Sequence, residues 1–502
     1  MSIFRGCGSW PCRAQETRVG ARLHDKLMHT QRSRQRWAVF LASLVLVAGT
    51  IALYLLLQRP SISLIDRIRQ AGELVVATRH SPTTFFAGAE GTDGFSYELV
   101  ERFAAELGVS VRYTFPATID QLLDDIGHGR VHMAAARLGM TEGKRRQMRF
   151  SLPFTSIEQQ LVYRRGDSKP NSFDDIGPGQ LFVIAGSSHE ETLRALRETG
   201  HPSLAWVPVD GIGADPLLAR LDRGEIRMTL ADANEIALHR RIYRHIAVAF
   251  DLDNSYPVAW GFPPAGDDSL REAANRFLQS MTDNGSLQQL QARFFGHNGR
   301  LNFVDTREFW RQVRDRLPRY RAHFEEAAEL TGIDWRLLAA IGYQESHWQA
   351  DAVSPTGVRG IMMLTQGTAK QMGLTDRDDP RQSIIGGARY LRVVERKIPE
   401  RIAEPNRLWL TLAGYNIGFG HLEDARVLTQ RDGGDPDLWM DVKKRLPLLA
   451  KKAHYKTVRY GFARGQEPVD YVDNIRNYYD MLVWFTTTAD DSTRAYLLAA
   501  DD

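Results

Sequence analysis

The arrangement of apolar and polar residues divides the chain into three stretches. Residues 37–57 form a charge-free, mostly apolar run. From about residue 64 to residue 297 short apolar runs alternate with amphipathic stretches, and beyond about residue 305 apolar residues recur at three- and four-residue intervals. These patterns predict, in order, an apolar helix, an α/β region and a mainly α region.

The middle stretch has the pattern of a parallel sheet covered by helices, because predicted strands alternate with predicted helices. Its third strand runs into Gly-Ser-Ser-His-Glu at residues 186–190, a turn suited to presenting backbone N–H groups to an anion at a helix N-terminus. The strands are predicted at residues 73–78, 111–115 and 180–185, and the helices at 96–107 and 119–127.

In the third stretch one carboxylate interrupts an apolar stripe. Leu338, Ile341, Glu345 and Trp348 share one face of a predicted helix, with Asp334 as its N-cap. A desolvated carboxyl without a cationic partner keeps its proton to higher pH, and a place near the C-terminal end of a helix raises the pKa further. The pattern predicts an acid able to protonate a leaving group near neutral pH. The alternative is a glutamate at the edge of the stripe whose carboxylate reaches solvent.

The sequence offers no clear second acid beside Glu345. Glycoside hydrolysis normally takes two carboxylates. Asp351 lies just after the predicted helix, whereas Asp376, Asp378 and Asp379 occupy a polar turn typical of solvated surface. Any glycosidase chemistry here would therefore start from one carboxyl.

The apolar run predicts export of everything that follows it. Residues 37–57 are enough to cross a hydrocarbon layer of ~30 Å. Arg32, Arg34 and Arg36 precede the run, which keeps residues 1–36 cytoplasmic by the positive-inside tendency. Small residues at 47–52 suit a signal peptidase, so the interpretations as a cleaved signal and as a membrane anchor both stay open.

The only two cysteines, Cys7 and Cys12, lie upstream of the apolar run. The exported part therefore has neither a lipoprotein cysteine nor a disulfide. Met28 opens a good basic segment before the run, which favours it as the true start of the protein.

Composition excludes some classes. A length of 502 residues suggests roughly three globular units, and a formal charge of +3 argues against a nucleic-acid surface. The fourteen histidines are scattered, and His347 beside Glu345 lacks a second ligand four residues on, so neither a metal nor a cofactor is predicted. Residues 486–502 are polar and predict a frayed tail.

Several motifs follow one another in the third stretch. They are Glu-Ser-His-Trp at 345–348, Ser-Pro-Thr-Gly-Val-Arg-Gly-Ile-Met-Met-Leu at 354–364, Gly-Tyr-Asn at 414–416 and Tyr-Val-Asp-Asn at 471–474. Together they resemble the goose-type lysozyme and soluble lytic transglycosylase superfamily, over residues 305–485. The resemblance implies a mainly α, lysozyme-like domain that binds peptidoglycan glycan strands.

The resemblance also implies a role for each motif residue. Glu345 would be the acid and base, and Met363 and Gln366 depart from the Gln and Pro that the family usually has. The implied substrate-binding residues are Ser346, Ser354, Met362, Tyr415, Asn416 and Tyr471.

The resemblance, together with the absent second acid, implies a transglycosylase reaction. The N-acetyl group of N-acetylmuramic acid would act as nucleophile at the β-1,4 bond to N-acetylglucosamine, and Glu345 would then deprotonate the 6-hydroxyl to give a 1,6-anhydro end. Two alternatives stay open. One is a lysozyme-like hydrolase in which an unidentified acid activates water, and the other is a non-catalytic glycan or solute receptor.

Residues 64–297 resemble the family 3 periplasmic solute-binding proteins, which have two α/β lobes around a ligand cleft. The matching pieces are Gly-Phe-Ser-Tyr-Glu-Leu at 94–99, Gly-Met-Thr-Glu-Gly-Lys at 139–144, Phe-Ser-Leu-Pro-Phe at 150–154 and Thr-Leu-Ala-Asp at 229–232. By this resemblance Lys144, Ser188 and Asp232 would line the cleft. Lys144 stands where the family has an arginine that grips a carboxylate.

Lysine cannot reproduce the planar fork of arginine, so a free amino acid is not the expected ligand. A muropeptide, that is a peptide-bearing cell-wall fragment, is predicted instead, with occupancy transmitted to the catalytic unit through residues 296–306. The alternative is a cleft kept only as scaffold. The layout predicts a periplasmic, membrane-associated protein, held at the outer membrane by resemblance or at the inner membrane if the apolar run is not cleaved.

Overall fold

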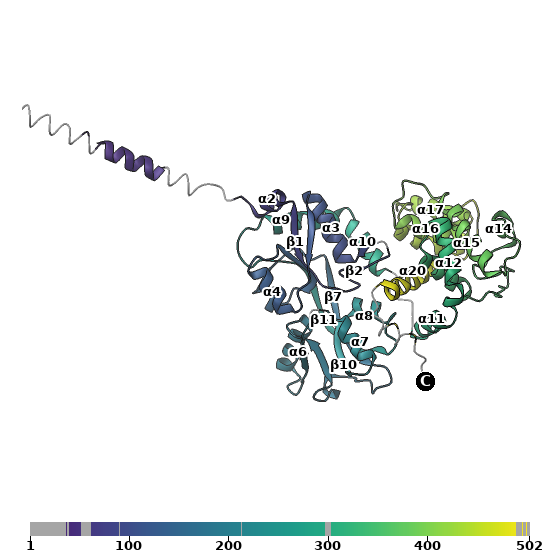
Figure 1. Cartoon of the computed structure of the whole chain (residues 1–502), viewed down its shortest axis with the longest axis horizontal. Helices are drawn as coiled ribbons and strands as arrows, with labels where there is room; N and C mark the ends of the chain where they lie inside the picture. The colour runs from purple at the N-terminus through teal and green to yellow at the C-terminus, as the bar shows by residue number, and fades with distance from the viewer. Residues whose placement is uncertain are drawn as a thin grey trace, which may run out of the picture. The chain divides into compact units, whose positions relative to one another are not determined.

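The computed structural model describes residues 37, 40–51, 62–89, 91–211, 213–296, 303–487, 494 and 498. The chain divides into two units, Met1–Ser63 and Leu64–Asp502 (Figure 1). Within the second unit an α/β region precedes a helical region, in the order that the hydrophobic pattern predicts.

The predicted apolar helix is described only at Trp37 and residues 40–51, which are helical and exposed. Among the described residues no helix has the length and apolarity needed to span a bilayer, so the predicted N-terminal transmembrane helix is not supported by them. Met28, both cysteines and the basic segment before residue 37 lie outside the described residues.

The two lobes of the α/β region share one sheet. Its main strands are β1 (Glu73–Ala77), β4 (Ser110–Thr114), β5 (Met133–Gly139), β7 (Thr155–Arg164), β8 (Leu181–Ile184), β9 (Val207–Val209), β10 (Met228–Asp232) and β11 (Ile246–Phe262). They lie in the order β4-β1-β5-β11-β7-β10-β8-β9. β1 is parallel to β4 and β5, and β8 is parallel to β9 and β10, whereas the long strands β7 and β11 pair antiparallel and join the two parallel sets.

The predicted elements of this region are confirmed to within one or two residues. α3 (Phe95–Leu107) buries Phe95, Leu99 and Phe103 on one face, as its apolar spacing requires. α4 (Ile119–Gly127) begins at Thr118, whose side chain accepts from the backbone N–H of Gln121. The other elements are α2 (Leu64–Ala71), α5 (Glu142–Arg145), α6 (Ser188–Thr199), α7 (Asp215–Asp222), α8 (Ala233–His239), α9 (Ser269–Asp283), α10 (Ser286–Phe295) and the short strands β2 (Phe86–Ala87), β3 (Thr92–Asp93) and β6 (Arg149–Phe150).

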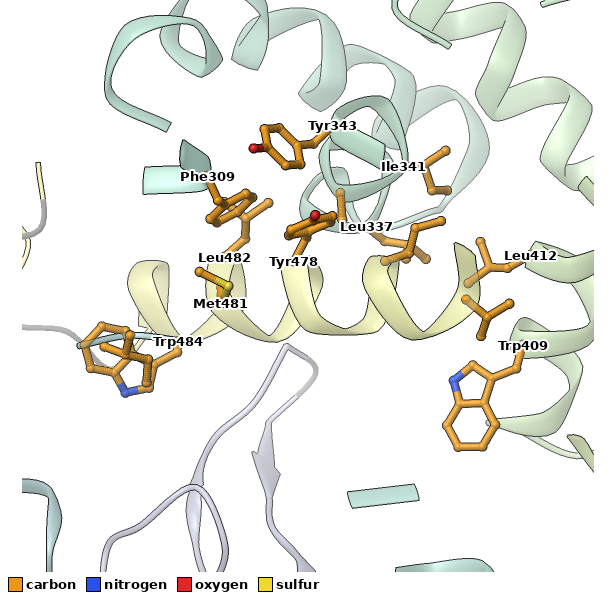
Figure 2. Close-up of a cluster of buried hydrophobic side chains, with 14 of the residues drawn as sticks. Phe309, Leu337, Ile341, Tyr343, Trp409, Leu412, Tyr478, Met481, Leu482 and Trp484 are labelled. Carbon is orange, nitrogen blue, oxygen red and sulfur yellow. The ribbon is translucent and has the colours of Figure 1, made fainter. Parts of the chain in front are cut away.

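The helical region is built around two packed helices, α13 (Trp335–Ser346) and α20 (Gln466–Thr487). Figure 2 shows the aromatic and aliphatic side chains between them, where the ring of Tyr478 on α20 lies 4.7 Å from that of Tyr343 and 5.0 Å from that of Phe309, centroid to centroid. The other helices are α11 (Phe303–Asp315), α12 (Leu317–Thr331), α14 (Gln366–Gln371), α15 (Pro380–Glu395), α16 (Asn406–Ile417), α17 (Phe419–Arg431), α18 (Trp439–Arg445) and α19 (Lys452–Tyr455).

Two sequence expectations differ from the structure at helix ends. Trp348 is not on the predicted helix, because His347 (φ 51°) and Trp348 (φ 56°) are left-handed and end α13 at Ser346. Trp348 is nevertheless fully buried, and its indole N–H donates to the carbonyl of Ala339 at 2.8 Å. At the other end of the region, α20 continues to Thr487, so the predicted tail begins inside a helix.

Candidate active site and solute-binding cleft

Helix α13 carries Glu345 one residue before its C-terminus. The helix starts as predicted at Asp334, whose carboxylate accepts from the backbone N–H of Arg336 at 2.8 Å. Leu338 and Ile341, seven and four residues before Glu345, are fully buried. Glu345 therefore continues a buried face and meets the negative end of the helix.

The Glu345 carboxyl is withdrawn from water, although part of the residue reaches the surface. Burial raises its pKa to about 7, against the opposing effect of a hydrogen bond that the Tyr471 hydroxyl donates to Oε1 at 2.6 Å. Among the described residues, burial and Tyr471 are the only two influences on this pKa, so no cation or second carboxylate shifts it. A carboxyl of this kind can give a proton and take one back near neutral pH.

Tyr471 is held in place by the packing of α20. It lies seven residues before Tyr478, so both side chains share the helix face that meets α13. Burial raises the pKa of Tyr471 well above its usual value, which keeps its hydroxyl a donor to Glu345. Its ring lies parallel to that of Tyr415, with 6.5 Å between centroids and 14° between planes.

Tyr415 and Asn416 lie near the C-terminus of α16. The Tyr415 hydroxyl donates to the carbonyl of Met362 at 3.2 Å, and Asn416 is exposed beside it. The structure therefore brings Glu345, Tyr415 and Tyr471 together, with Asn416 next to Tyr415 in the chain.

The loop after α13 places the other motif residues in structural roles. The Ser346 hydroxyl lies 2.9 Å from the carbonyl of Ile361, which ties the loop to α13. Ser354 accepts from the backbone N–H groups of Thr356 and Val358, both at 3.2 Å, and so shapes a turn. The Met362 side chain, implied above to bind substrate, is fully buried and belongs to the core.

Two residues of α15, Gly387 and Ser383, explain the burial of Met362. Gly387 leaves room for it, because a Cβ at Gly387 would approach the Met362 side chain to 2.7 Å. The buried hydroxyl of Ser383 accepts from the backbone N–H of Met362 at 3.2 Å. In the sequence, the signals for both are a glycine pair and a serine on the apolar face of this helix.

In the α/β region Lys144 is already paired. Its side chain is buried, and its Nζ donates to Glu191 Oε1 at 2.6 Å. Lys144 follows β5 in one lobe and Glu191 lies on α6 in the other, so the pair joins the lobes across the cleft. The charge expected to meet a ligand is thus neutralised by the protein itself.

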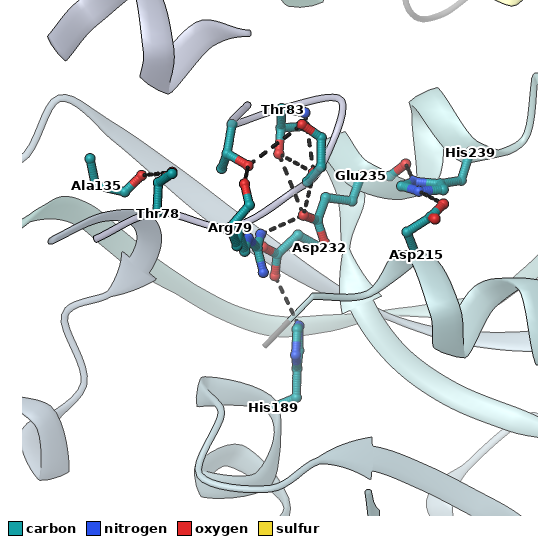
Figure 3. Close-up of polar contacts among 11 residues, drawn as sticks. Thr78, Arg79, Thr83, Ala135, His189, Asp215, Asp232, Glu235 and His239 are labelled. Atoms are coloured by element: carbon teal, nitrogen blue, oxygen red, sulfur yellow. Dashed lines mark hydrogen bonds and ion pairs between the residues drawn. The ribbon is translucent and has the colours of Figure 1, made fainter. Parts of the chain in front are cut away.

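Asp232 and the predicted anion-binding turn are also engaged. Asp232 Oδ1 lies 2.9 Å from His189 Nε2 (Figure 3). Ser188, which begins α6, is buried. The backbone N–H of Gly186 donates to the carboxylate of Glu190 at 2.7 Å, so an internal carboxylate occupies the place expected for an external anion.

Several buried charges of this cleft are not apparent from the sequence patterns. Arg79, after β1, bonds Glu235 on α8 and adds a second pair between the lobes (Figure 3). Arg137 on β5 also lines the cleft, together with Lys144 and Asp232. The cavity among them measures about 40 Å³, which is room for a few water molecules.

Both regions match known families. Residues 322–436 match the Transglycosylase SLT domain, and residues 74–297 match the Bacterial extracellular solute-binding proteins, family 3. Among solved structures, a mutant of ArgBP from T. maritima resembles the chain with 20% identity and a TM-score of 0.42, covering 46% of this chain and 99% of that one.

Curated relatives match across most of the chain. The Membrane-bound lytic murein transglycosylase F of Ectopseudomonas mendocina is 45% identical over 431 residues, which cover 86% of this chain and 88% of that protein. The Membrane-bound lytic murein transglycosylase F 1 of Alkalilimnicola ehrlichii is 46% identical over 421 residues, covering 84% and 85%. Because this identity extends over more than four fifths of both chains, the chain belongs to the membrane-bound lytic murein transglycosylase F family.

Proposed function

We propose that this protein is a peptidoglycan lytic transglycosylase in which Glu345 is both acid and base. The names of the relatives support the reaction class. The observation that carries the assignment is the buried Glu345 carboxyl, with a pKa of about 7 and a hydrogen bond from Tyr471.

The proposed reaction uses the Glu345 carboxyl twice, first as an acid and then as a base. Protonated Glu345 gives its proton to the glycosidic oxygen between N-acetylmuramic acid and N-acetylglucosamine, and the N-acetyl carbonyl oxygen bonds C1 as the leaving sugar departs. The Glu345 carboxylate then takes the proton of the 6-hydroxyl, whose oxygen bonds C1 while the N-acetyl group is released. The product is a 1,6-anhydro end, and Glu345 is protonated again.

Neighbouring groups have distinct proposed roles in this reaction. Tyr471 orients the carboxyl in both protonation states, because its high pKa keeps it a donor. Tyr415 and Asn416 bind the glycan from the end of α16, and Ser346 and Ser354 hold the loop that faces it.

Product analysis of purified sacculi treated with the full chain tests the reaction. Anhydro ends are expected, and Glu345→Gln should lower their rate of formation by about 10²- to 10⁴-fold. Asp351→Asn, which changes an exposed acid in the loop after the same helix, is the matched control and should retain activity. Reducing ends would instead identify a hydrolase, and bound but uncleaved murein would identify a glycan receptor.

We further propose that residues 64–297 form the solute-binding domain, residues 305–485 the catalytic domain and residues 486–502 a tail. Residues 37–57 would direct export, with the mature enzyme membrane-associated in the periplasm. Fractionation of cells that carry a C-terminally labelled chain tests this: protease added to spheroplasts should digest the label. A label that resists protease in intact spheroplasts but not after lysis would refute export.

We also propose that a muropeptide binds the cleft that contains Lys144, Ser188 and Asp232. The pairs from Lys144 to Glu191 and from Arg79 to Glu235 support this, because a ligand that separates them would change how the lobes are held together. Titration of a muropeptide digest into the full chain, followed by calorimetry, should show saturable heat. Absence of heat at millimolar concentration would leave the cleft as scaffold.

A further inference from the structure

Arg137 is a buried cation whose hydrogen-bonding capacity is unused. It lies on β5 with 4% of its surface exposed, and its side chain lines the cavity of the cleft. None of its three guanidinium nitrogens has a hydrogen-bond partner among the residues that the structure describes. Arginine carries five N–H donors, and burying them without acceptors is costly.

The backbone at Arg137 is also unusual. Its φ of 53° is in the left-handed region, which residues with side chains seldom adopt. A strained backbone and an unsatisfied buried charge at one residue are both costs to folding, and such costs concentrate where proteins bind ligands.

Burial disfavours the charge of Arg137 and lowers its pKa, and two carboxylates oppose this effect without bonding the guanidinium. Asp232 and Glu235 attract the guanidinium, although Asp232 is bonded to His189 and Glu235 to Arg79. The guanidinium carbon also lies 5.4 Å from the centre of the Phe295 ring, at cation–π distance. Its N–H donors therefore stay available for a guest.

Lys144 is less suited to hold an anion, since Glu191 already bonds its ammonium at 2.6 Å. A ligand carboxylate there would have to displace Glu191, which carries the same charge. A guanidinium, by contrast, matches a carboxylate with two parallel hydrogen bonds. Among the described residues, Lys144 and Arg79 are thus paired cations of this cleft, whereas Arg137 is unbonded.

We propose that Arg137 is the carboxylate-binding residue of this cleft, and that the ligand is a peptide with a free carboxylate. This inference rests on the proposed binding of a cell-wall peptide. The cavity of about 40 Å³ is too small for a peptide, so the two pairs between the lobes must separate before Arg137 receives it.

Calorimetry on the full chain tests the proposal with two matched probes. One is the cell-wall tripeptide L-alanyl-γ-D-glutamyl-meso-diaminopimelate with free carboxylates, and the other is the same peptide with those groups amidated. Wild type should bind the acid at least about tenfold more tightly than the amide. Arg137→Met should remove that preference, whereas Lys144→Met, the matched loss of a cation in the same cleft, should keep it.

Arg137→Lys keeps the charge but loses the fork, so it should reduce the preference several-fold without changing the unfolding temperature by much. Arg137→Lys also replaces Arg137→Met in the binding test if Arg137→Met fails to fold. A preference lost in Lys144→Met but kept in Arg137→Met would overturn the inference while leaving peptide binding intact. Equal wild-type binding of both probes would overturn it in the same way. Binding of neither probe would refute the proposed cleft ligand too, without affecting the assignment of murein cleavage.

Discussion

At the scale of single residues, the same side chain has different chemistry in different surroundings. Burial raises the pKa of Glu345 to about 7, whereas partly exposed Glu326 has its pKa lowered by hydrogen bonds from Arg381. Both are helical glutamates of the same region. What distinguishes the candidate acid is the loss of water without the gain of a cation.

Tyr471→Phe should shift the pH dependence of murein cleavage. Glu345 must be protonated for the first step, so activity falls as pH rises above about 7. The Tyr471 hydrogen bond lowers this pKa, and its removal should move the alkaline limb to higher pH while reducing the maximal rate. The pH–rate profile of anhydro-end formation measures both effects, and an unshifted limb would assign it to another group.

Glu345 should also make stability depend on pH. Its folded pKa lies above the ordinary 4.5, so the folded state binds the proton more tightly and stability falls as pH rises from about 4.5 to about 7. The glutamine side chain of Glu345→Gln cannot ionise. The free energy of unfolding of this variant should therefore exceed that of wild type by up to about 3 kcal/mol at pH 8 and by little at pH 4. Urea unfolding of both proteins at the two pH values measures this, and equal gains would contradict it.

At the scale of elements, two helices and one loop together form the site. α13 supplies Glu345, α20 supplies Tyr471, and the loop between α13 and α14 is tied to α13 through Ser346. The apolar spacing within α13 could be recognised from sequence. The path of the loop could not be recognised from sequence. It depends on Gly360, whose positive φ of 79° lets the loop backbone pass close to Arg377.

Two glycines of this loop provide a matched test of that path. Gly357 and Gly360 both have a positive φ, but a Cβ at Gly357 meets open space, whereas one at Gly360 would lie 2.0 Å from the carbonyl oxygen of Arg377. Gly357→Ala should lower the free energy of unfolding by about 1 kcal/mol, because only its backbone conformation is unfavourable for alanine. Gly360→Ala should cost about 3 kcal/mol or more, since backbone must move. Chemical denaturation compares them, and equal costs would show that the loop yields freely.

At the scale of the whole molecule, ion pairs between residues far apart in the sequence hold the cleft. Lys144 and Glu191 are 47 residues apart in sequence, and Arg79 and Glu235 are 156 apart. Each pair joins the two parallel strand sets through side chains, in addition to the continuous strands β7 and β11.

Glu191→Gln should therefore destabilise the α/β region. It leaves Lys144, only 2% exposed, without its charged partner, and breaking a buried pair in this way costs about 3 kcal/mol or more. Lys144→Met should cost less, because the Glu191 side chain is 26% exposed and can be hydrated. The double variant should recover stability relative to Glu191→Gln. Thermal unfolding of the three variants checks this order. If the double variant lost as much stability as the two single variants added together, Lys144 and Glu191 would not be paired.

Local patterns in the sequence determined the strands, the helices and the isolated Glu345, because periodicity and capping act over a few residues. The sequence motifs indicated both the solute-binding domain and the transglycosylase domain. Only the tertiary structure decided the pKa of Glu345, the burial of Met362, the neutralisation of Lys144 and the unbonded state of Arg137. Each of these depends on which distant side chain approaches and how much water is excluded, and packing alone fixes both.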